Sequence, residues 1–409
     1  MFSSTLSKAL LCPAGLVLST FSLLAAEISA PRTIALEECL KRAAERSPDL
    51  QAGAYRTEAA AYRAKVAARP PNPKITAESE NFSGSGDFSG TRAAESTLSL
   101  TQEIELGGKR HSRTEAAKSE TDASRAAQGV ALQARMLETR RAALALLTAQ
   151  RKTRLAEEEV ALSREIESVA TAREKAGKAT VLETGRARAE TAQALIALEV
   201  RRAEQHSAAR ELAQCWGESE PAFDTLADTP GAQPQDLPPL DALILGAASN
   251  PQLLAAEATV RTSQTKTAVE RSARVPNLEV GAGMRRFEEN GDYAAVASVG
   301  VELPLFTRNM DGVRAAEADA EAARLDSVSV RLRIEAQIRQ FYAKLAALDT
   351  GRRRYDETVL PLAESNLNLM RQAHRQGKAG YLEVLEAQRS LVTDRKSTRL
   401  NSSHGYSSY

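Results

Sequence analysis

The residues best placed to act chemically are two carboxylates, Glu383 and Glu386, in the segment GKAGYLEVLEAQRS. Residues three apart share one face of a helix, so both side chains point the same way. Carboxylates along a narrow passage repel anions and attract cations. The alternative interpretation is a pair of ordinary glutamates on a solvated helix surface. The matching segment of the first half keeps Glu183 but has Arg186 at the second position, so the two segments are not equivalent.

The sequence contains no arrangement typical of an enzyme or a metal centre. Its four histidines, at positions 111, 206, 374 and 404, have no histidine or cysteine three or four residues away, and neither HExxH nor CxxC occurs. Residues 176–180, AGKAT, resemble the end of a phosphate-binding loop, but the first glycine and the Ser/Thr directly after the lysine are missing. We therefore expect no catalytic residue, no cofactor and no bound metal.

The acidic segment follows a Gly-Lys turn that occurs twice, 200 residues apart. Residues 177–187 and 377–387 are identical at six of eleven positions. Glycine adopts the left-handed conformation that commonly ends a helix, so each turn is expected to join a long helix to a returning helix. The exposed ends of these two helix hairpins are then Gly177, Lys178, Gly377 and Lys378.

The repeated turn belongs to a longer duplication, in which each half runs helix, strand pair, long helix and returning helix. The first repeat is expected at 31–215, with strands at 74–82 and 96–105, a long helix at 110–175 and a returning helix at 180–214. A Pro-rich linker at 216–239 leads to the second repeat at 240–395, with strands at 277–287 and 293–305, a long helix at 311–375 and a shortened returning helix at 380–394.

The strand pairs alternate apolar and polar residues with a period of two, which is typical of strands with one apolar face. The residues expected on these apolar faces are Leu98, Leu100 and Ile104, and then Tyr293, Val299, Val301 and Leu303. An ordinary hairpin on a soluble sheet is the alternative. Against it, four strands leave no other sheet and no large apolar core for such a face to cover.

Each long helix would span about 100 Å at 1.5 Å per residue, far more than a globular domain. One stripe along the first helix is spaced by 7, 11, 7 and 7 residues: Leu137, Leu144, Leu155, Leu162 and Val169. Heptads supercoil to the left and an eleven-residue step relaxes that twist, so the stripe suits helices packed side by side in a long wall. A free-standing coiled coil would explain the helices but not the strand pairs.

Composition agrees with a mainly α-helical protein. Lys plus Arg (54) balances Asp plus Glu (53), so no net charge draws the chain toward nucleic acid.

Cys39 and Cys215 are expected to be buried free thiols. Residues 1–30 have the pattern of a secretory signal peptide, with a single membrane anchor as the alternative. The Ser-rich residues 396–409 have no counterpart in the repeat and are interpreted as a truncated or foreign end.

Over essentially the whole chain up to about residue 394, the duplicated layout resembles the TolC-like family of outer-membrane efflux channels. The segment PPNPKITAESENFSGSGDFSG, with the STLSLTQEIELGGKR that follows it, is similar to the CzcC-like heavy-metal branch that serves cobalt-zinc-cadmium pumps. The Gly-Lys turns and the LEVLEAQRS after the second turn also look like hairpin tips of this family.

The resemblance implies a homotrimer in the outer membrane, with four strands per chain in one twelve-stranded transmembrane β-barrel above a periplasmic α-helical tunnel. It implies a periplasmic adaptor (membrane fusion protein) docked at the hairpin tips, an inner-membrane resistance-nodulation-division pump, and contact with outer-membrane lipid. It also implies that Glu383 and Glu386 of three chains ring the periplasmic entrance. Independently, four strands cannot close a barrel and open edges cannot face lipid, so oligomerisation is expected.

Two kinds of alternative function stay open from the sequence. Within the family, the cargo could be drugs or secreted proteins in place of heavy-metal cations. From another class, a periplasmic adaptor or a structural coiled coil also has long helical hairpins. An adaptor would show one hairpin flanked by lipoyl-like halves, whereas this chain has two strand pairs that each lead into a long helix.

Overall fold

The computed structural model describes residues 32–227, 237–376 and 378–380, followed by 383, 384, 386–388, 390 and 391. The expected signal peptide 1–30, the tail 396–409 and Gly377 lie outside the described residues. So do residues 228–236 of the linker 216–239 and much of the returning helix expected at 380–394.

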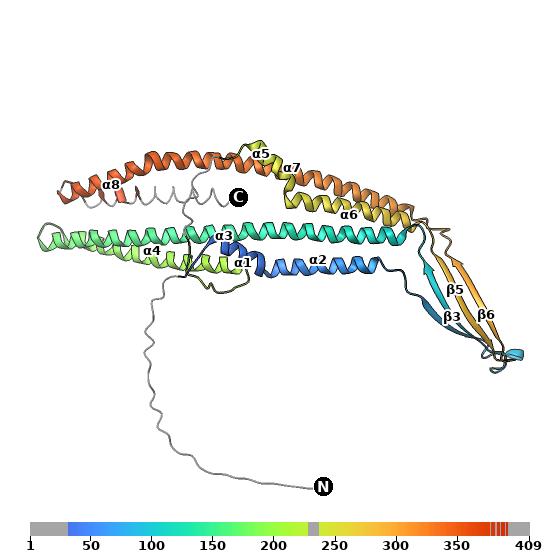
Figure 1. Ribbon diagram of the computed structural model, residues 1–409. Helices are drawn as coiled ribbons and strands as arrows, with labels where there is room; N and C mark the ends of the chain where they lie inside the picture. Colours follow the sequence, from blue (N-terminus) through green and yellow to red (C-terminus); the bar gives the residue numbers. More distant parts are fainter. Residues whose placement is uncertain are drawn as a thin grey trace, which may run out of the picture.

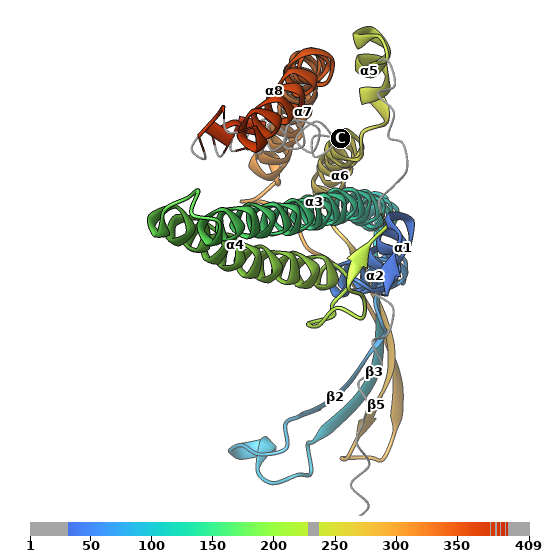
Figure 2. The ribbon, with the colours of Figure 1, turned by 90° about the vertical axis from the view of Figure 1, so that its left-hand side faces the viewer.

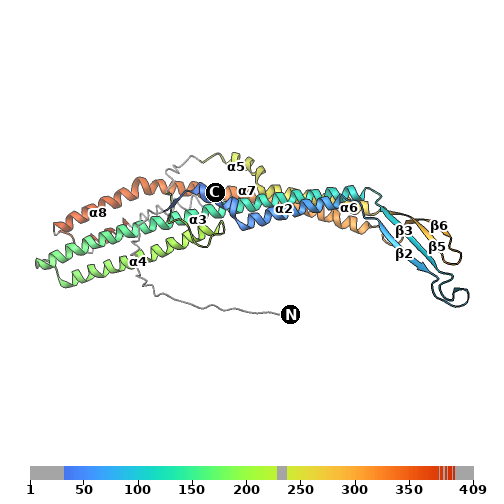
Figure 3. The ribbon, with the colours of Figure 1, turned by 60° about the horizontal axis from the view of Figure 1, so that its bottom comes forward.

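The molecule is elongated, with a small sheet at one end (Figures 1 and 3). Two helical limbs, residues 109–214 and residues 310–375, point away from this sheet. The elements of the first half are β1 (Thr33–Ile34), α1 (Leu36–Arg46), α2 (Pro48–Ala67), β2 (Lys74–Glu80), β3 (Glu95–Ile104), α3 (Lys109–Lys175), α4 (Val181–Gln214) and β4 (Thr225–Leu226). Those of the second half are α5 (Leu240–Gly246), α6 (Pro251–Ala273), β5 (Leu278–Phe287), β6 (Tyr293–Val301), α7 (Met310–Arg354) and α8 (Leu360–Arg375).

The strand pairs of the two halves join into one antiparallel sheet with the order β2-β3-β5-β6. The central pairing runs the full length of β3, from Glu95 opposite Phe287 to Ile104 opposite Leu278. Strands β2 and β6 are therefore the two edges of the sheet. Strand β6 ends at Val301, before Leu303 and short of the expected residue 305, because Pro304 has no N–H to continue a ladder.

The second long helix is interrupted where the first is continuous. Helix α3 runs from Lys109 to Lys175 without a break, whereas a π-helical turn at Tyr355–Val359 separates α7 from α8. Pro361 lies just after this turn and cannot donate to the carbonyl of Glu357, with which its ring also clashes in a regular helix. The wider turn accommodates the proline, which accounts for the departure from the uninterrupted helix expected at 311–375.

The main core lies midway along the molecule, where α3 and α4 meet α1 and the short parallel pair β1–β4. Leu146 and Leu212 are fully buried there, and the rings of Trp216 and Phe223 pack with centroids 6.0 Å apart. Cys39 and Cys215 belong to the same core as free thiols. Burial raises the pKa of the Cys39 thiol to about 11 and raises that of Cys215, so both stay protonated and unreactive.

Helix α3 packs against α2, α4 and α6 mainly through small residues. Its buried positions include Ala143, Ala149, Thr153 and Ala156, and the last three follow one another by about one helical turn. The expected leucine stripe is only partly buried in the protomer, since Leu155 is enclosed but Val169 is 39% exposed. Small residues let helix axes approach closely, so they, more than the leucines, form the contact within the chain. None of the helices that the structure describes combines the length and hydropathy of a membrane-spanning segment.

Candidate functional site

The first hairpin tip is a tight, fully hydrogen-bonded helix end. After α3, Gly177 takes a left-handed conformation with φ of 69°, and the Lys178 N–H donates to the Arg173 carbonyl at 2.8 Å. The Thr180 hydroxyl then accepts from the N–H of Glu183 and caps α4. Lys178 is exposed. The turn is therefore an exposed end of the hairpin that α3 and α4 form.

The second tip repeats this bond in the residues that are described. The Lys378 N–H donates to the Ala373 carbonyl at 2.9 Å, as Lys178 does to Arg173 exactly one repeat earlier in the chain. Gly377 itself lies outside the described residues. Both limbs point the same way, so the two tips lie at the end of the molecule opposite the sheet (Figures 1 and 3). Figure 2, in which this end faces the viewer, shows the helices α3 and α4 beside α7 and α8.

The two predicted carboxylates share one face of the segment after the second tip. Glu383 and Glu386 are exposed, whereas Val384 and Leu391 on the other side pack against Leu367 of α8. Glu383 also accepts a hydrogen bond through Oε2 from the Gly380 N–H at 2.8 Å, which satisfies an N–H at the start of this segment. In one protomer, therefore, both carboxylates are directed away from the packed interior of their own hairpin.

The sheet has two chemically different faces, defined by the strand register. The apolar face carries large side chains with exposed fractions between 47% and 73%: Ile75, Leu98, Leu100, Met284, Tyr293, Val299 and Val301. Leu98, Leu100 and Ile104 share this face, as the alternation of the sequence predicts. No element of the described chain covers it, and a water-soluble protein rarely leaves so continuous an apolar surface open.

The opposite face of the sheet is polar and is organised around Arg285. Its guanidinium contacts Glu95 at 2.7 Å and Glu80 at 3.1 Å, and its Nε donates to the hydroxyl of Thr97 at 3.0 Å. These contacts join β2, β3 and β5 side by side. The cluster was not among the residues singled out from the sequence, because it depends on the pairing of β3 with β5, nearly two hundred residues apart.

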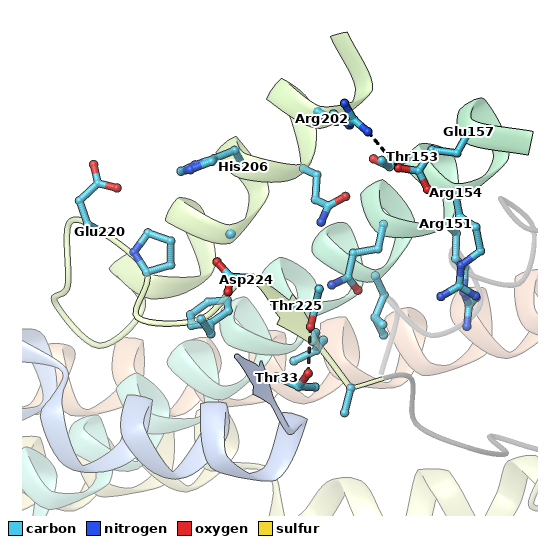
Figure 4. Close-up of a pocket in the computed structure, with 18 residues that line it drawn as sticks. Thr33, Arg151, Thr153, Arg154, Glu157, Arg202, His206, Glu220, Asp224 and Thr225 are labelled. Atoms are coloured by element: carbon cyan, nitrogen blue, oxygen red, sulfur yellow. Dashed lines mark hydrogen bonds and ion pairs between the residues drawn. The ribbon is translucent and has the colours of Figure 1, made fainter. Parts of the chain in front are cut away.

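A hollow of about 870 Å³ lies where α3 and α4 meet β4 (Figure 4). Arg202 pairs with Glu157 across it at 3.3 Å, and the hydroxyls of Thr33 and Thr225 lie 3.0 Å apart. Its charged side chains balance in sign: Arg151, Arg154 and Arg202 against Glu157, Glu220 and Asp224. The hollow therefore has no preference for anions or cations. Within the described residues, no group of three or more His, Cys, Asp or Glu side chains could hold a metal ion.

Comparison with known proteins agrees with this geometry. The family model described as "Outer membrane efflux protein" matches residues 39–218 and 245–402. The chain is 30% identical over 375 residues to the cobalt-zinc-cadmium resistance protein CzcC of Cupriavidus metallidurans. That alignment covers 90% of this chain and 86% of CzcC. It is 28% identical over 340 residues to the nickel-cobalt-cadmium resistance protein NccC of Alcaligenes xylosoxydans xylosoxydans, which covers 82% of this chain and 74% of that protein.

Two solved structures share the fold over nearly the whole chain. The outer membrane protein VceC of Vibrio cholerae superposes with a TM-score of 0.74 at 18% identity, covering 91% of this chain and 93% of that one. A membrane protein from Pseudomonas aeruginosa gives a TM-score of 0.73 at 22% identity, with 91% of each chain covered. At these identities the likeness establishes the fold alone.

Proposed function

Because this chain belongs to the outer membrane efflux protein family, we propose that it works as a trimeric exit duct for divalent heavy-metal cations. As an outer-membrane efflux channel that extends into the periplasm, it has a transport role, and the periplasmic adaptor and the structural coiled coil considered above are excluded as its identity. The trimer, the partners and the cargo are the parts that we propose.

The two-faced sheet is the observation that supports a trimeric barrel. A four-stranded sheet with free edges at β2 and β6 would leave backbone N–H and C=O groups unpaired in lipid, at a cost of several kcal/mol each. If β6 of one copy pairs with β2 of the next, three copies of four strands close a twelve-stranded barrel, within the known range of bacterial barrels. The apolar face then meets lipid and the Arg285 face lines the pore.

The helical end supports contact with the other parts of an efflux system. In this proposal a periplasmic adaptor docks on the tips at Gly177, Lys178, Gly377 and Lys378, and an inner-membrane pump of the resistance-nodulation-division class delivers cargo through it. Glu383 and Glu386 of the three copies ring the entrance and favour cations. The described parts of the two structural repeats form the wall in this proposal.

The names of the relatives support the proposed cargo. CzcC and NccC are named for resistance to cobalt, zinc, cadmium and nickel, and each aligns with more than four fifths of this chain. We therefore favour these divalent cations over drugs or secreted proteins. The wall needs no metal site, since a duct can conduct an ion without holding it.

Deletion of the gene in its own host is expected to lower tolerance to cobalt, zinc or cadmium while leaving drug tolerance unchanged. Growth in graded concentrations of each metal and of several drugs measures both, and a plasmid copy should restore metal tolerance. The reverse pattern, with normal metal tolerance and lost drug tolerance, would contradict the proposed cargo and favour the drug channel.

A further inference from the structure

The apolar face of the sheet carries a single charged residue. Successive residues of β5 face opposite sides of the sheet. The register with β3 and β6 puts Arg286 on the apolar side, together with Met284 and Ala282. Within the four strands, the remaining charged residues all fall on the polar face: Lys74, Glu78, Glu80, Glu95, Glu103, Glu279 and Arg285. Arg286 is therefore the exception that needs a reason.

Arg286 stands at the end of the sheet farthest from the helices. It pairs with Tyr293 in the last register position of β5 and β6, and Ser96 of β3 lies on its other side. At about 3.4 Å per residue it is roughly 14 Å along the strand from Ala282 at the middle of the sheet. The lipid-facing band of an outer-membrane barrel is about 25 Å tall. In the proposed barrel, with the middle of the sheet at the middle of this band, Arg286 would lie at its outer edge, where headgroups begin.

The surroundings of Arg286 leave its guanidinium available. Its side chain is 48% exposed, and its ion pair with Glu288 at 3.3 Å is also open to solvent. Such exposed pairs are weak and exchange readily for a better partner. A hollow of about 460 Å³ adjoins it, and its lining includes Ser79, Ser96, Leu98, Met284 and Tyr293 as well as the acidic residue Glu78.

We propose that Arg286 and Tyr293 form a binding site for a phosphorylated lipid headgroup of the outer leaflet. The guanidinium fork matches two phosphate oxygens, while the ring of Tyr293 has the amphipathic character favoured at a membrane interface. Leu98 and Met284 below them offer an apolar surface to an acyl chain. This inference rests on the proposed barrel, because it needs the apolar face to meet lipid.

Binding of bisphosphorylated lipid A to the purified trimer in detergent tests the site, with the thermal unfolding midpoint as the readout. Lipid A should raise the midpoint of the unmodified protein in a saturable way, and inorganic phosphate should not. Arg286→Gln is expected to weaken the apparent affinity roughly fivefold, corresponding to about 1 kcal/mol per basic residue at an anionic surface. Arg286→Lys should retain part of the response.

The matched control is Lys74→Gln, which removes one positive charge from the polar face of the same sheet. It should keep the full response to lipid A. An Arg286→Gln protein that responds like the unmodified one, or a response reproduced by inorganic phosphate, overturns the inference. Flotation of the unmodified protein with lipid vesicles distinguishes a failure of the proposed barrel from a failure of the Arg286 site. Failure to float contradicts the barrel itself, whereas flotation with a response independent of Arg286 contradicts only this site.

Discussion

Ala297→Arg is expected to prevent the chain from assembling in the outer membrane, whereas Ser298→Arg is expected to leave assembly largely intact. The two positions are neighbours on β6, both are exposed in the protomer, and they face opposite sides of the sheet. Ala297 lies on the apolar face opposite Ala282. An arginine at the middle of a lipid-facing strand costs about 2–4 kcal/mol, and three copies in a trimer multiply that penalty.

The Ser298 position is exposed on the other face, so an arginine side chain there can extend into solvent. Ser298 lies opposite Gly281, which has no side chain, and both belong to the polar face. The heat-resistant trimer recovered from the outer-membrane fraction measures assembly of both variants. Equal assembly of the two, or loss of Ser298→Arg alone, would mean that the apolar face does not meet lipid and that the assignment of the two faces is wrong.

The second large effect concerns ion selectivity. Replacing Glu383 and Glu386 together by glutamine removes up to six negative charges from a trimer, if the two carboxylates of each chain ring the entrance. In a planar bilayer the double variant is expected to lose its preference for cations and its block by multivalent cations. Glu183→Gln is the matched control, since its helix has Arg186 at the place of the second acid, and it should change little.

Glutamine is the right replacement because of the contact that Glu383 makes. Its Oε2 accepts from the Gly380 N–H, and the glutamine side chain keeps an oxygen that can accept the same bond. The charge is thus removed with little change to the start of the helical segment. Unaltered selectivity and block in the double variant would mean that these carboxylates face solvent or a neighbouring helix, as ordinary surface glutamates do.

The parts of this fold that could be predicted from the sequence are those set by residues close together in the chain. The two-residue alternation around Leu98 and Leu100 is a property of one strand, and the structure places both on the apolar face as predicted. The Gly177 turn needs only its own few residues, since the positive φ and the bond from Lys178 to Arg173 are both local. Because the chain is duplicated, the same predictions of a strand pair and a helix-ending turn could be made for the second half.

Features that depend on distant pairings were not predictable in this way. The contacts of Arg285 with Glu80 and Glu95 require the register between β5 and the first strand pair. Likewise, the leucine stripe of α3 indicated a helical wall without showing that the small residues Ala143 and Ala156 are among the buried positions of this helix. The π turn before Pro361 had a visible cause in the sequence, yet periodicity alone favoured a continuous helix.

Accessibility of the two ends of the molecule from outside the cell tests most directly whether the chain spans the outer membrane with its helices in the periplasm. Single cysteines replace Ser85, in the exposed turn between β2 and β3, and Lys178 at the first tip. Cys12 lies in the expected signal peptide 1–30. Cys39 and Cys215 can stay in place, because both are buried and their raised pKa values keep them unreactive. A bulky maleimide that cannot cross the outer membrane should label Ser85→Cys in intact cells, and Lys178→Cys only after the membrane is opened. Labelling of Lys178→Cys but not Ser85→Cys in intact cells would contradict this orientation and the exit duct built on it.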